Sequence, residues 1–303
     1  MKRFENILVC IDALSLHVPQ GDPLPHHVVS LMNHARWGQK ISGARLTLMA
    51  VIDEHSGPDV IASVTEMVRE QLLPLVAESG ADIEVVAGLP FREIIRRVLR
   101  HGHDLVMLAA RKHSLVHRSI VGSTAIKLMR KCPCPVWVVP RHFDHRPLTV
   151  LSAVGFHGIT RRILELSARL AELTEGEWHV LHCMEYPREG AMRLQKASAD
   201  AIDEYRAKAR DEAWKRMHEL AEPVAKESGV TPRFWLAQGD ADEEVIKAVS
   251  QLDVDVIVMG TVGREGVPGM LIGNTAEKVL QLVECSVLAV KPDSFVSPIT
   301  LDG

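Results

Sequence analysis

The chain repeats itself, and this repeat constrains its fold more than any other feature of the sequence. When the sequence is shifted by 151 residues, similar residues fall on one another through the second half of each copy. The matched positions are Gly88 with Gly239, Glu93–Ile95 with Glu244–Ile246, Asp104–Leu108 with Asp255–Met259, Gly122 with Gly273, Thr124 with Thr275, and Cys134 with Cys285. So many matches at one offset indicate a duplication.

The repeat predicts two similar domains, residues 1–144 and residues 145–303. The joint lies in the polar segment 141–147, which ends on Pro147. Because this segment is short, we expect the two copies to pack together rather than to move freely.

Each copy alternates apolar, strand-like runs with amphipathic segments, of which 199–221 has the clearest helical period. The runs are rich in Val, Ile and Leu on both faces, as in a parallel sheet that helices cover. We therefore predict an α/β fold of two tandem Rossmann-like domains, each a doubly wound sheet. The expected strands lie near 6–11, 45–51, 83–87, 104–109 and 135–139, and near 148–154, 178–183, 232–237, 254–259 and 286–290.

Composition narrows the possible partners. Of 303 residues, 47% are hydrophobic and 24% are charged, so a disordered chain is not expected. The net charge of −4 leaves no basic excess for a nucleic-acid backbone. The apolar run 7–11 is too short for a secretory signal, and no run approaches the length needed to cross a bilayer. We expect a cytoplasmic protein that binds neither nucleic acid nor membrane.

The five cysteines lie in or beside apolar runs, which favours reduced thiols in the core. Cys132 and Cys134, separated by Pro133, form the only close pair, and a metal or redox role for them is the less favoured alternative. The fifteen histidines include local clusters such as His113 and His117, but none matches a metal-site spacing. No metal site is predicted.

A glycine-rich segment follows the fourth strand of the second copy. It reads Met259-Gly260-Thr261-Val262-Gly263, then nine residues, then Gly273-Asn274-Thr275-Ala276-Glu277. Glycines here let backbone N–H groups approach an anion, and a helix beginning at Gly273 adds further donors. The same residues also suit a purely structural role, with Asn274 capping the helix and Glu277 completing a capping box. From these residues alone, both interpretations remain open.

At this motif the chain resembles the universal stress protein family. A Gly-x2-Gly-x9-Gly pattern with a small polar residue after it resembles that family's ATP-binding motif, and the strand Ile7–Asp12 resembles its opening strand. The sequence Asn-Thr-Ala-Glu at 274–277 is similar to that of the tandem universal stress protein E subgroup. The resemblance implies adenine nucleotide alpha hydrolase-like domains with five parallel strands each. The fifth strands, 135–139 and 286–290, would pair within the chain and form an intrachain pseudo-dimer.

The resemblance also implies a site in the second domain for ATP or AMP, with Mg²⁺ as a companion ion. Phosphates would contact Gly260, Gly263, Gly273, Asn274 and Thr275, while Met259 and Gly260 would lie along the ribose and Cys183 would border the adenine. Two departures stand out: Asn274 replaces the usual Ser or Thr, and Gly155 takes the place of the first-strand Asp.

In the first domain the motif is degenerate. Ala109 and Lys112 stand where the first two glycines should be, and the site that remains consists of Asp12, Val51, Gly122 and Ser123. We therefore expect the nucleotide in the second domain. The first copy also carries an insertion, 13–25, which is interpreted as a tolerated insertion in preference to a lid.

No catalytic motif is present: the sequence lacks Gly-x-Ser-x-Gly and His-Glu-x-x-His, and no residue stands out as a general base. The leading hypothesis is a non-enzymatic regulator in the stress response that binds an adenine nucleotide and a protein partner not identified by the sequence. The alternatives are a nucleotide-independent scaffold or small-molecule-binding protein, and a weak ATPase. A homodimer is also compatible with the sequence.

Overall fold

The computed structural model describes residues 4–19, 22–110, 122–140, 147–261 and 273–301. The chain divides into two compact units, Arg146–Gly260 on one hand and Lys2–His145 with Thr261–Gly303 on the other. The last helix and strand of the second copy thus belong to the same unit as the first copy. The domain boundary expected at residue 144 stays a prediction.

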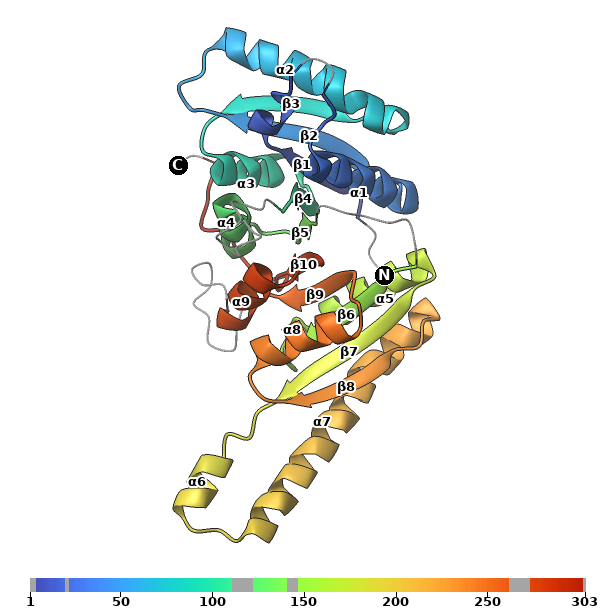
Figure 1. The fold of residues 1–303 in the computed structure, drawn as a ribbon, viewed down its shortest axis with the longest axis vertical. Helices are drawn as coiled ribbons and strands as arrows, with labels where there is room; N and C mark the ends of the chain where they lie inside the picture. Colours follow the sequence, from blue (N-terminus) through green and yellow to red (C-terminus); the bar gives the residue numbers. More distant parts are fainter. Residues whose placement is uncertain (1–3, 20–21, 111–121, 141–146, 262–272, 302–303) are drawn as a thin grey trace. The chain divides into compact units, whose positions relative to one another are not determined.

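The first copy forms a parallel five-stranded sheet with the order β3-β2-β1-β4-β5 (Figure 1). In the register, Ile7 lies opposite both Leu46 and Leu105. The helices α3 and α4 lie side by side, and α1 packs against β1 and β4. The elements are β1 (Asn6–Ile11), η1 (Ala13–Leu16), α1 (His26–Ser42), β2 (Arg45–Ile52), α2 (Pro58–Leu72), η2 (Leu73–Ser79), β3 (Asp82–Ala87), α3 (Pro90–His101), β4 (Leu105–Ala109), α4 (Ser123–Lys131) and β5 (Val136–Val139).

The unit Arg146–Gly260 repeats the first four strands of this arrangement, with the parallel order β9-β6-β7-β8. Val150 lies opposite both Trp178 and Val256, as Ile7 lies opposite Leu46 and Leu105 in the first copy. The α/β fold predicted from the repeat is therefore confirmed. The elements are β6 (Thr149–Val154), α5 (Thr160–Thr174), β7 (Glu177–Met184), α6 (Glu189–Leu194), α7 (Ala199–Ser228), β8 (Arg233–Gln238), α8 (Ala241–Gln251) and β9 (Val256–Gly260).

The fifth strands of the two copies pair with each other. After α9 (Asn274–Leu282), strand β10 (Ser286–Val290) runs antiparallel to β5, with Val287 opposite Val138 and Leu288 opposite Trp137. All four of these side chains are buried, so the pairing removes apolar surface from water as well as forming backbone hydrogen bonds. The pairing expected from the family resemblance is confirmed.

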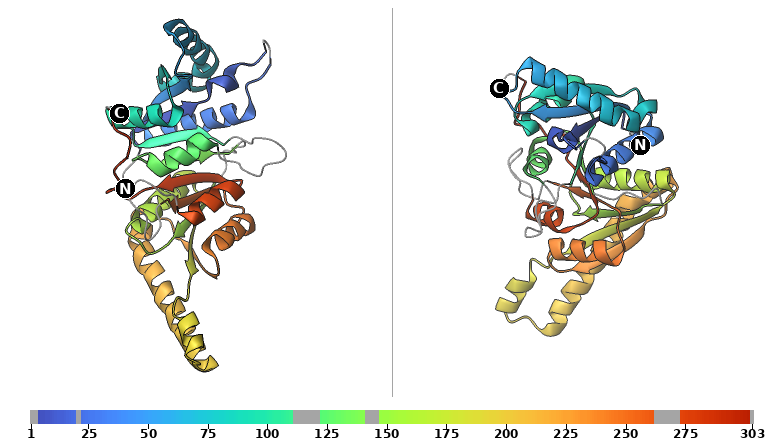
Figure 2. Two further views of the ribbon diagram at one scale, coloured as in Figure 1. Left: turned by 90° about the vertical axis from the view of Figure 1, so that its left-hand side faces the viewer. Right: turned by 45° about the horizontal axis from the view of Figure 1, so that its top comes forward.

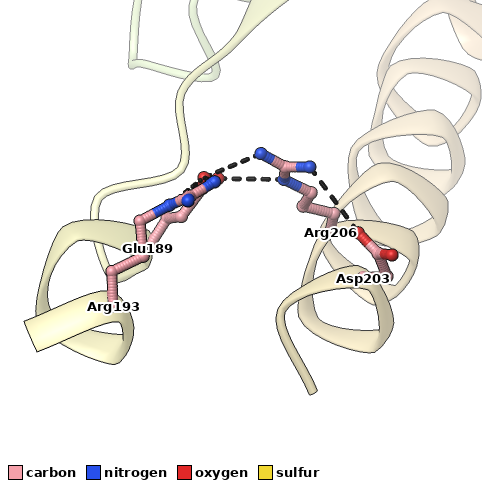
Figure 3. A network of polar contacts seen from close by, with 4 residues as sticks. All are labelled: Glu189, Arg193, Asp203 and Arg206. Carbon is pink, nitrogen blue, oxygen red and sulfur yellow. Dashed lines mark hydrogen bonds and ion pairs between the residues drawn. The ribbon is translucent and has the colours of Figure 1, made fainter. Parts of the chain in front are cut away.

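The second copy carries a helical arm. The helix expected over 199–221 runs from Ala199 to Ser228, since the Ser198 side chain caps its start and Gly229, at φ 72°, ends it. Figure 2 shows α6 and the first turns of α7 extending beyond the strands of their unit. In Figure 3 the Glu189 carboxylate lies between Arg193 and Arg206, and both guanidinium groups bind it at 2.7 Å. Hydrogen bonds from Arg206 and Arg193 lower the pKa of Glu189, so this contact persists at neutral pH.

The insertion of the first copy begins as packed structure. Asp12 caps η1, in which Ala13 and Leu16 are buried, as the interpretation of a tolerated insertion expects. Within the parts of the chain that the structure describes, no helix combines the length and the apolar composition needed to cross a membrane.

Candidate functional site

In the second copy, the end of β9 is closely packed. Met259 is buried, and a Cβ atom added to Gly260 would lie 3.3 Å from Ile159 Cγ2, which leaves no room for a larger residue without movement. Cys183 lies at the end of β7 and is partly buried; burial, with Glu244 and Glu185 nearby, raises the pKa of its thiol to about 11. The thiol is therefore neutral at physiological pH.

The start of α9 does not form the capping box that its sequence suggests. Gly273 is the N-cap residue, and among the described residues no side chain caps the helix; the Gly273 amide donates to the Thr261 carbonyl at 2.9 Å. Asn274 is already the first helical residue, and the Glu277 carboxylate binds Arg130 at 2.8 Å. The capping box of Asn274 and Glu277 is therefore wrong, because the helix begins one residue too early for Asn274 to cap it.

The residues of the predicted second-domain site are divided between the two compact units. Met259, Gly260 and Cys183 belong to the unit Arg146–Gly260, whereas Gly273, Asn274 and Thr275 belong to the other unit. Gly263 lies outside the described residues. The assignment of these seven residues to one nucleotide site stays a prediction.

In the first copy the structure brings together all four residues of the degenerate site. Asp12, Val51, Gly122 and Ser123 line one cavity of about 240 Å³ beyond the ends of β1, β2 and β4. The carboxyl edge of a parallel sheet is the usual place for ligands in this class of fold. The other lining residues are Cys10, Ile11, His27, Val28, Leu31, Met49, Pro90, Ile94, Leu108, Ala109, Thr124 and Ala125.

Asp12 is held at the cavity wall by hydrogen bonds. Its carboxylate accepts from the Leu14 amide at 3.2 Å and from the Ser15 hydroxyl at 3.0 Å, and the His27 ring lies 3.1 Å from that hydroxyl. The carboxylate thus has a fixed orientation. The sequence motif could not reveal His27, Leu31 or Ile94, because they come from helices outside the motif.

The N-terminus of α4 opens beside the same cavity. Gly122 is its N-cap residue and Ser123 is the first helical residue, and within the described part of the chain no side chain caps the helix. This matches the start of α9, where Gly273 takes the same place. Both copies therefore present a helix start without a side-chain cap, an arrangement that favours an anion.

The end of the first strand in the second copy has a different structure. Phe156, which follows Gly155, has a left-handed φ of 39°, and its ring contacts the His182 ring in a tilted arrangement with centroids 3.9 Å apart. The Arg216 guanidinium lies 5.1 Å from the Phe156 ring centroid. The glycine motif gave no signal for Phe156, His182 or Arg216, since their contacts come from strand ends and from α7.

No metal centre is found in the part of the chain that the structure covers: no three His, Cys, Asp or Glu side chains there could hold one ion. His113 and His117, together with Lys112, lie outside the described residues.

Comparisons with known proteins agree with this architecture. The sequence profile of the universal stress protein family matches residues 3–140 and again residues 148–291. The chain belongs to the universal stress protein family. Universal stress protein E of Escherichia coli (strain K12) is 28% identical to it over 326 aligned positions, covering 100% of this chain and 98% of that protein. The tandem, E-type organisation expected from the sequence is thus confirmed.

A solved structure that matches nearly the whole chain shares the fold. A universal stress protein from Archaeoglobus fulgidus DSM 4304 is 18% identical, with a TM-score of 0.65, and the match covers 94% of this chain and 98% of that one. A universal stress protein crystallised in complex with cAMP matches 47% of this chain and 95% of its own, at 17% identity and a TM-score of 0.32.

Proposed function

We propose that this universal stress protein is a non-enzymatic, cytoplasmic regulator of the stress response whose second domain binds ATP or AMP, with Mg²⁺ as companion ion. The observation that carries the proposal is the start of α9, where Gly273 precedes a helix with no side-chain cap. The first amides of a helix have no acceptor within the helix itself, so they are available to a ligand.

An anion fits this helix start for two reasons. The partial positive charge of a helix N-terminus favours phosphate, and backbone N–H groups can donate directly to its oxygens. Asn274 and Thr275, the first two helical residues, add an amide and a hydroxyl that can also donate. In this proposal, Gly260 and Gly263 supply the close backbone approach that the motif implies.

A regulatory role is favoured over catalysis by the chemistry of the described residues. The carboxylate at the first-domain cavity, Asp12, is already engaged by Leu14 and Ser15, which reduces its capacity to activate water. In this role the bound nucleotide would alter contacts with a protein partner.

Titration calorimetry with ATP and Mg²⁺ tests the nucleotide site. Gly273→Asp should abolish the binding heat, because it places a carboxylate where the phosphate would lie, while aspartate is a good N-cap residue and keeps the helix start intact. The matched control is Gly190→Asp, which adds the same charge in α6 at a position with free space. Equal affinity in wild type and Gly273→Asp would overturn the proposed site, and phosphate release over the same period would overturn the non-enzymatic assignment.

A second candidate rests on the first-domain cavity. Its walls are largely aliphatic, with Leu31, Ile94 and Leu108 among them, and it gathers the four residues of the degenerate site. A small, mainly apolar molecule would suit this cavity, which corresponds to a nucleotide-independent function. Val51→Trp should fill the cavity and displace such a ligand without changing ATP binding; a ligand retained at wild-type occupancy would rule this candidate out.

A further inference from the structure

A pair of buried thiols lies where α4 passes into β5. Cys132 is the C-cap residue of α4, its amide donating to the Leu128 carbonyl, and Cys134 follows two residues later. Their sulfur atoms are 3.5 Å apart, and the two residues are 0% and 8% exposed. The chain bends at Pro133 and Cys134 before β5 begins, and this bend holds the two thiols close together.

A buried lysine lies beside this pair. Lys291, which directly follows β10, is only 5% exposed, and its ammonium group donates to the Met129 carbonyl at the end of α4. It also lies 4.8 Å from the Phe295 ring centroid. Among the described residues it forms no ion pair with a carboxylate. A buried cation without an acidic partner is costly, and a thiolate is the anion nearest at hand.

The ionisation of the two thiols is unequal. Burial acts to raise the pKa of Cys132, but hydrogen bonds from Cys134 and the charge of Lys291 outweigh it, so the pKa is lowered. The hydrogen bond to Cys132, together with burial, raises the pKa of Cys134 well above its usual range. Burial lowers the pKa of Lys291 to about 8, against the attraction of both sulfurs, so most of this lysine is charged at pH 7. These directions favour the thiolate at Cys132 and the neutral thiol at Cys134.

We propose that Cys132 and Cys134 form a dithiol that hydroperoxides oxidise reversibly to a disulfide, and that Lys291 positions the attacking thiolate. This site lies apart from the proposed nucleotide motif and does not depend on it. Two observations suit this pair to the reaction: the 3.5 Å separation of its sulfur atoms and the buried cation beside it.

The reaction balances with a hydroperoxide as the oxidant. The Cys132 thiolate attacks one oxygen of the O–O bond; an S–O bond forms, the O–O bond breaks, and the departing oxygen takes up a proton to leave as an alcohol or water. The Cys134 thiol then attacks the sulfur of the sulfenic acid; an S–S bond forms, the S–O bond breaks, and water leaves with the thiol proton. The dithiol loses two electrons and the hydroperoxide gains them. A small external dithiol reverses the change by exchange.

The positions of lysine and arginine around the two cysteines allow a direct assay on the intact chain. Trypsin should release residues 132–141 as one peptide, since Lys131 precedes it and Arg141 ends it. After brief treatment with hydrogen peroxide and alkylation of free thiols, mass spectrometry should show this peptide unalkylated and lighter by two hydrogens. Treatment with dithiothreitol should restore both alkylation sites.

Variants assign the roles. Cys134→Ser should stop at a sulfenic acid on Cys132, which a dimedone reagent traps, and Cys132→Ser should leave Cys134 reduced. Cys285→Ser is the matched control, because Cys285 is the second-copy counterpart of Cys134, and it should oxidise as the wild type does. A peptide that stays reduced while Cys183 or Cys285 is oxidised would overturn the proposal, as would a bond between Cys132 and Cys10.

The part assigned to Lys291 has its own test. Lys291→Met keeps the length of the side chain and removes the charge, so disulfide formation at pH 7 should slow about tenfold, the change expected for a shift of one unit in the thiol pKa. Circular dichroism checks that the variant folds, and the difference in rate should vanish at high pH, where the thiol is ionised in both proteins. An unchanged rate at pH 7 would remove Lys291 from the mechanism.

Discussion

The first strands of the two copies end in different chemistry on the same fold. After β1, the Asp12 carboxylate accepts hydrogen bonds from the Leu14 amide and the Ser15 hydroxyl, and Asp12 lines a cavity. After β6, Gly155 leads into Phe156, whose ring contacts His182 and lies under the Arg216 guanidinium. One copy therefore keeps a polar side chain at the carboxyl edge of its sheet, and the other presents an aromatic pair there.

The helix starts that follow the fourth strands are alike in the two copies, unlike the ends of the first strands. Gly122 and Gly273 are both N-cap residues, and neither helix is capped by a side chain of the described residues. The duplication thus preserved the backbone features that suit an anion and changed the side chains that would contact the rest of a ligand. The two domains therefore need not bind the same molecule, although their strands have the same order.

The largest predicted loss of stability comes from substitutions in the fifth strands, where the two copies pair. Trp137 and Leu288 face each other across β5 and β10, and both are buried. Trp137→Ala should lower the free energy of unfolding by about 3–5 kcal/mol and Leu288→Ala by about 2–5 kcal/mol, because each leaves a cavity in the core. Urea unfolding measures both, with Leu194→Ala, at an 87% exposed position, as the control that should change little. If the two variants affected different unfolding transitions, the pairing within one chain would be contradicted.

A smaller effect concerns acid stability. His103 of the first copy is buried where the second copy has Val254. Burial, and then the charge of Arg97, lowers the pKa of His103 to about 4 from an ordinary value of 6.5. Between these pH values the unfolded chain binds a proton that the folded chain does not, so stability is full above pH 6.5 and falls as the pH decreases toward 4.

His103→Val should reduce this acid loss by about 1–2 kcal/mol, after allowance for solvent screening. The measurement is urea unfolding of both proteins at pH 7.5 and pH 4.5, compared within each protein so that a change in packing cancels. Equal acid losses in the two proteins would show that His103 does not titrate in this window.

The smallest effect concerns the backbone of Phe156. Its φ of 39° suits glycine better than alanine, so Phe156→Gly should be more stable than Phe156→Ala by about 1 kcal/mol, although both lose the ring contacts. Glycine and alanine variants of Lys215, which is exposed in α7, are the control. There the alanine variant should be the more stable, because alanine is favoured over glycine inside a helix. The same order at both positions would mean that the left-handed conformation is not retained.

Much of the fold could be predicted from the sequence because it depends on patterns of many residues. The repeat, the strand positions and the parallel sheets follow from apolar periodicity, and the pairing of β5 with β10 follows from the family resemblance. The helix beginning near residue 199 was predicted as well, but its end was not, since Gly229 lies beyond the clear part of the pattern.

The site was less predictable because it depends on single side chains. The glycine motif correctly places helix starts after Gly122 and Gly273, yet a shift of one residue decides whether Asn274 caps the helix or begins it. The cavity wall at Ile94 and the approach of Lys291 to Cys132 join residues far apart in the sequence. No local pattern carries that information.

The most direct test of the proposed function uses the nucleotide that the protein retains on purification. Wild type, Gly122→Asp and Gly273→Asp are heat-denatured, and the supernatants are analysed by chromatography and mass spectrometry. We expect one adenine nucleotide per chain in the wild type and in Gly122→Asp, and none in Gly273→Asp. Loss in Gly122→Asp with retention in Gly273→Asp would place the site in the first domain and contradict the account.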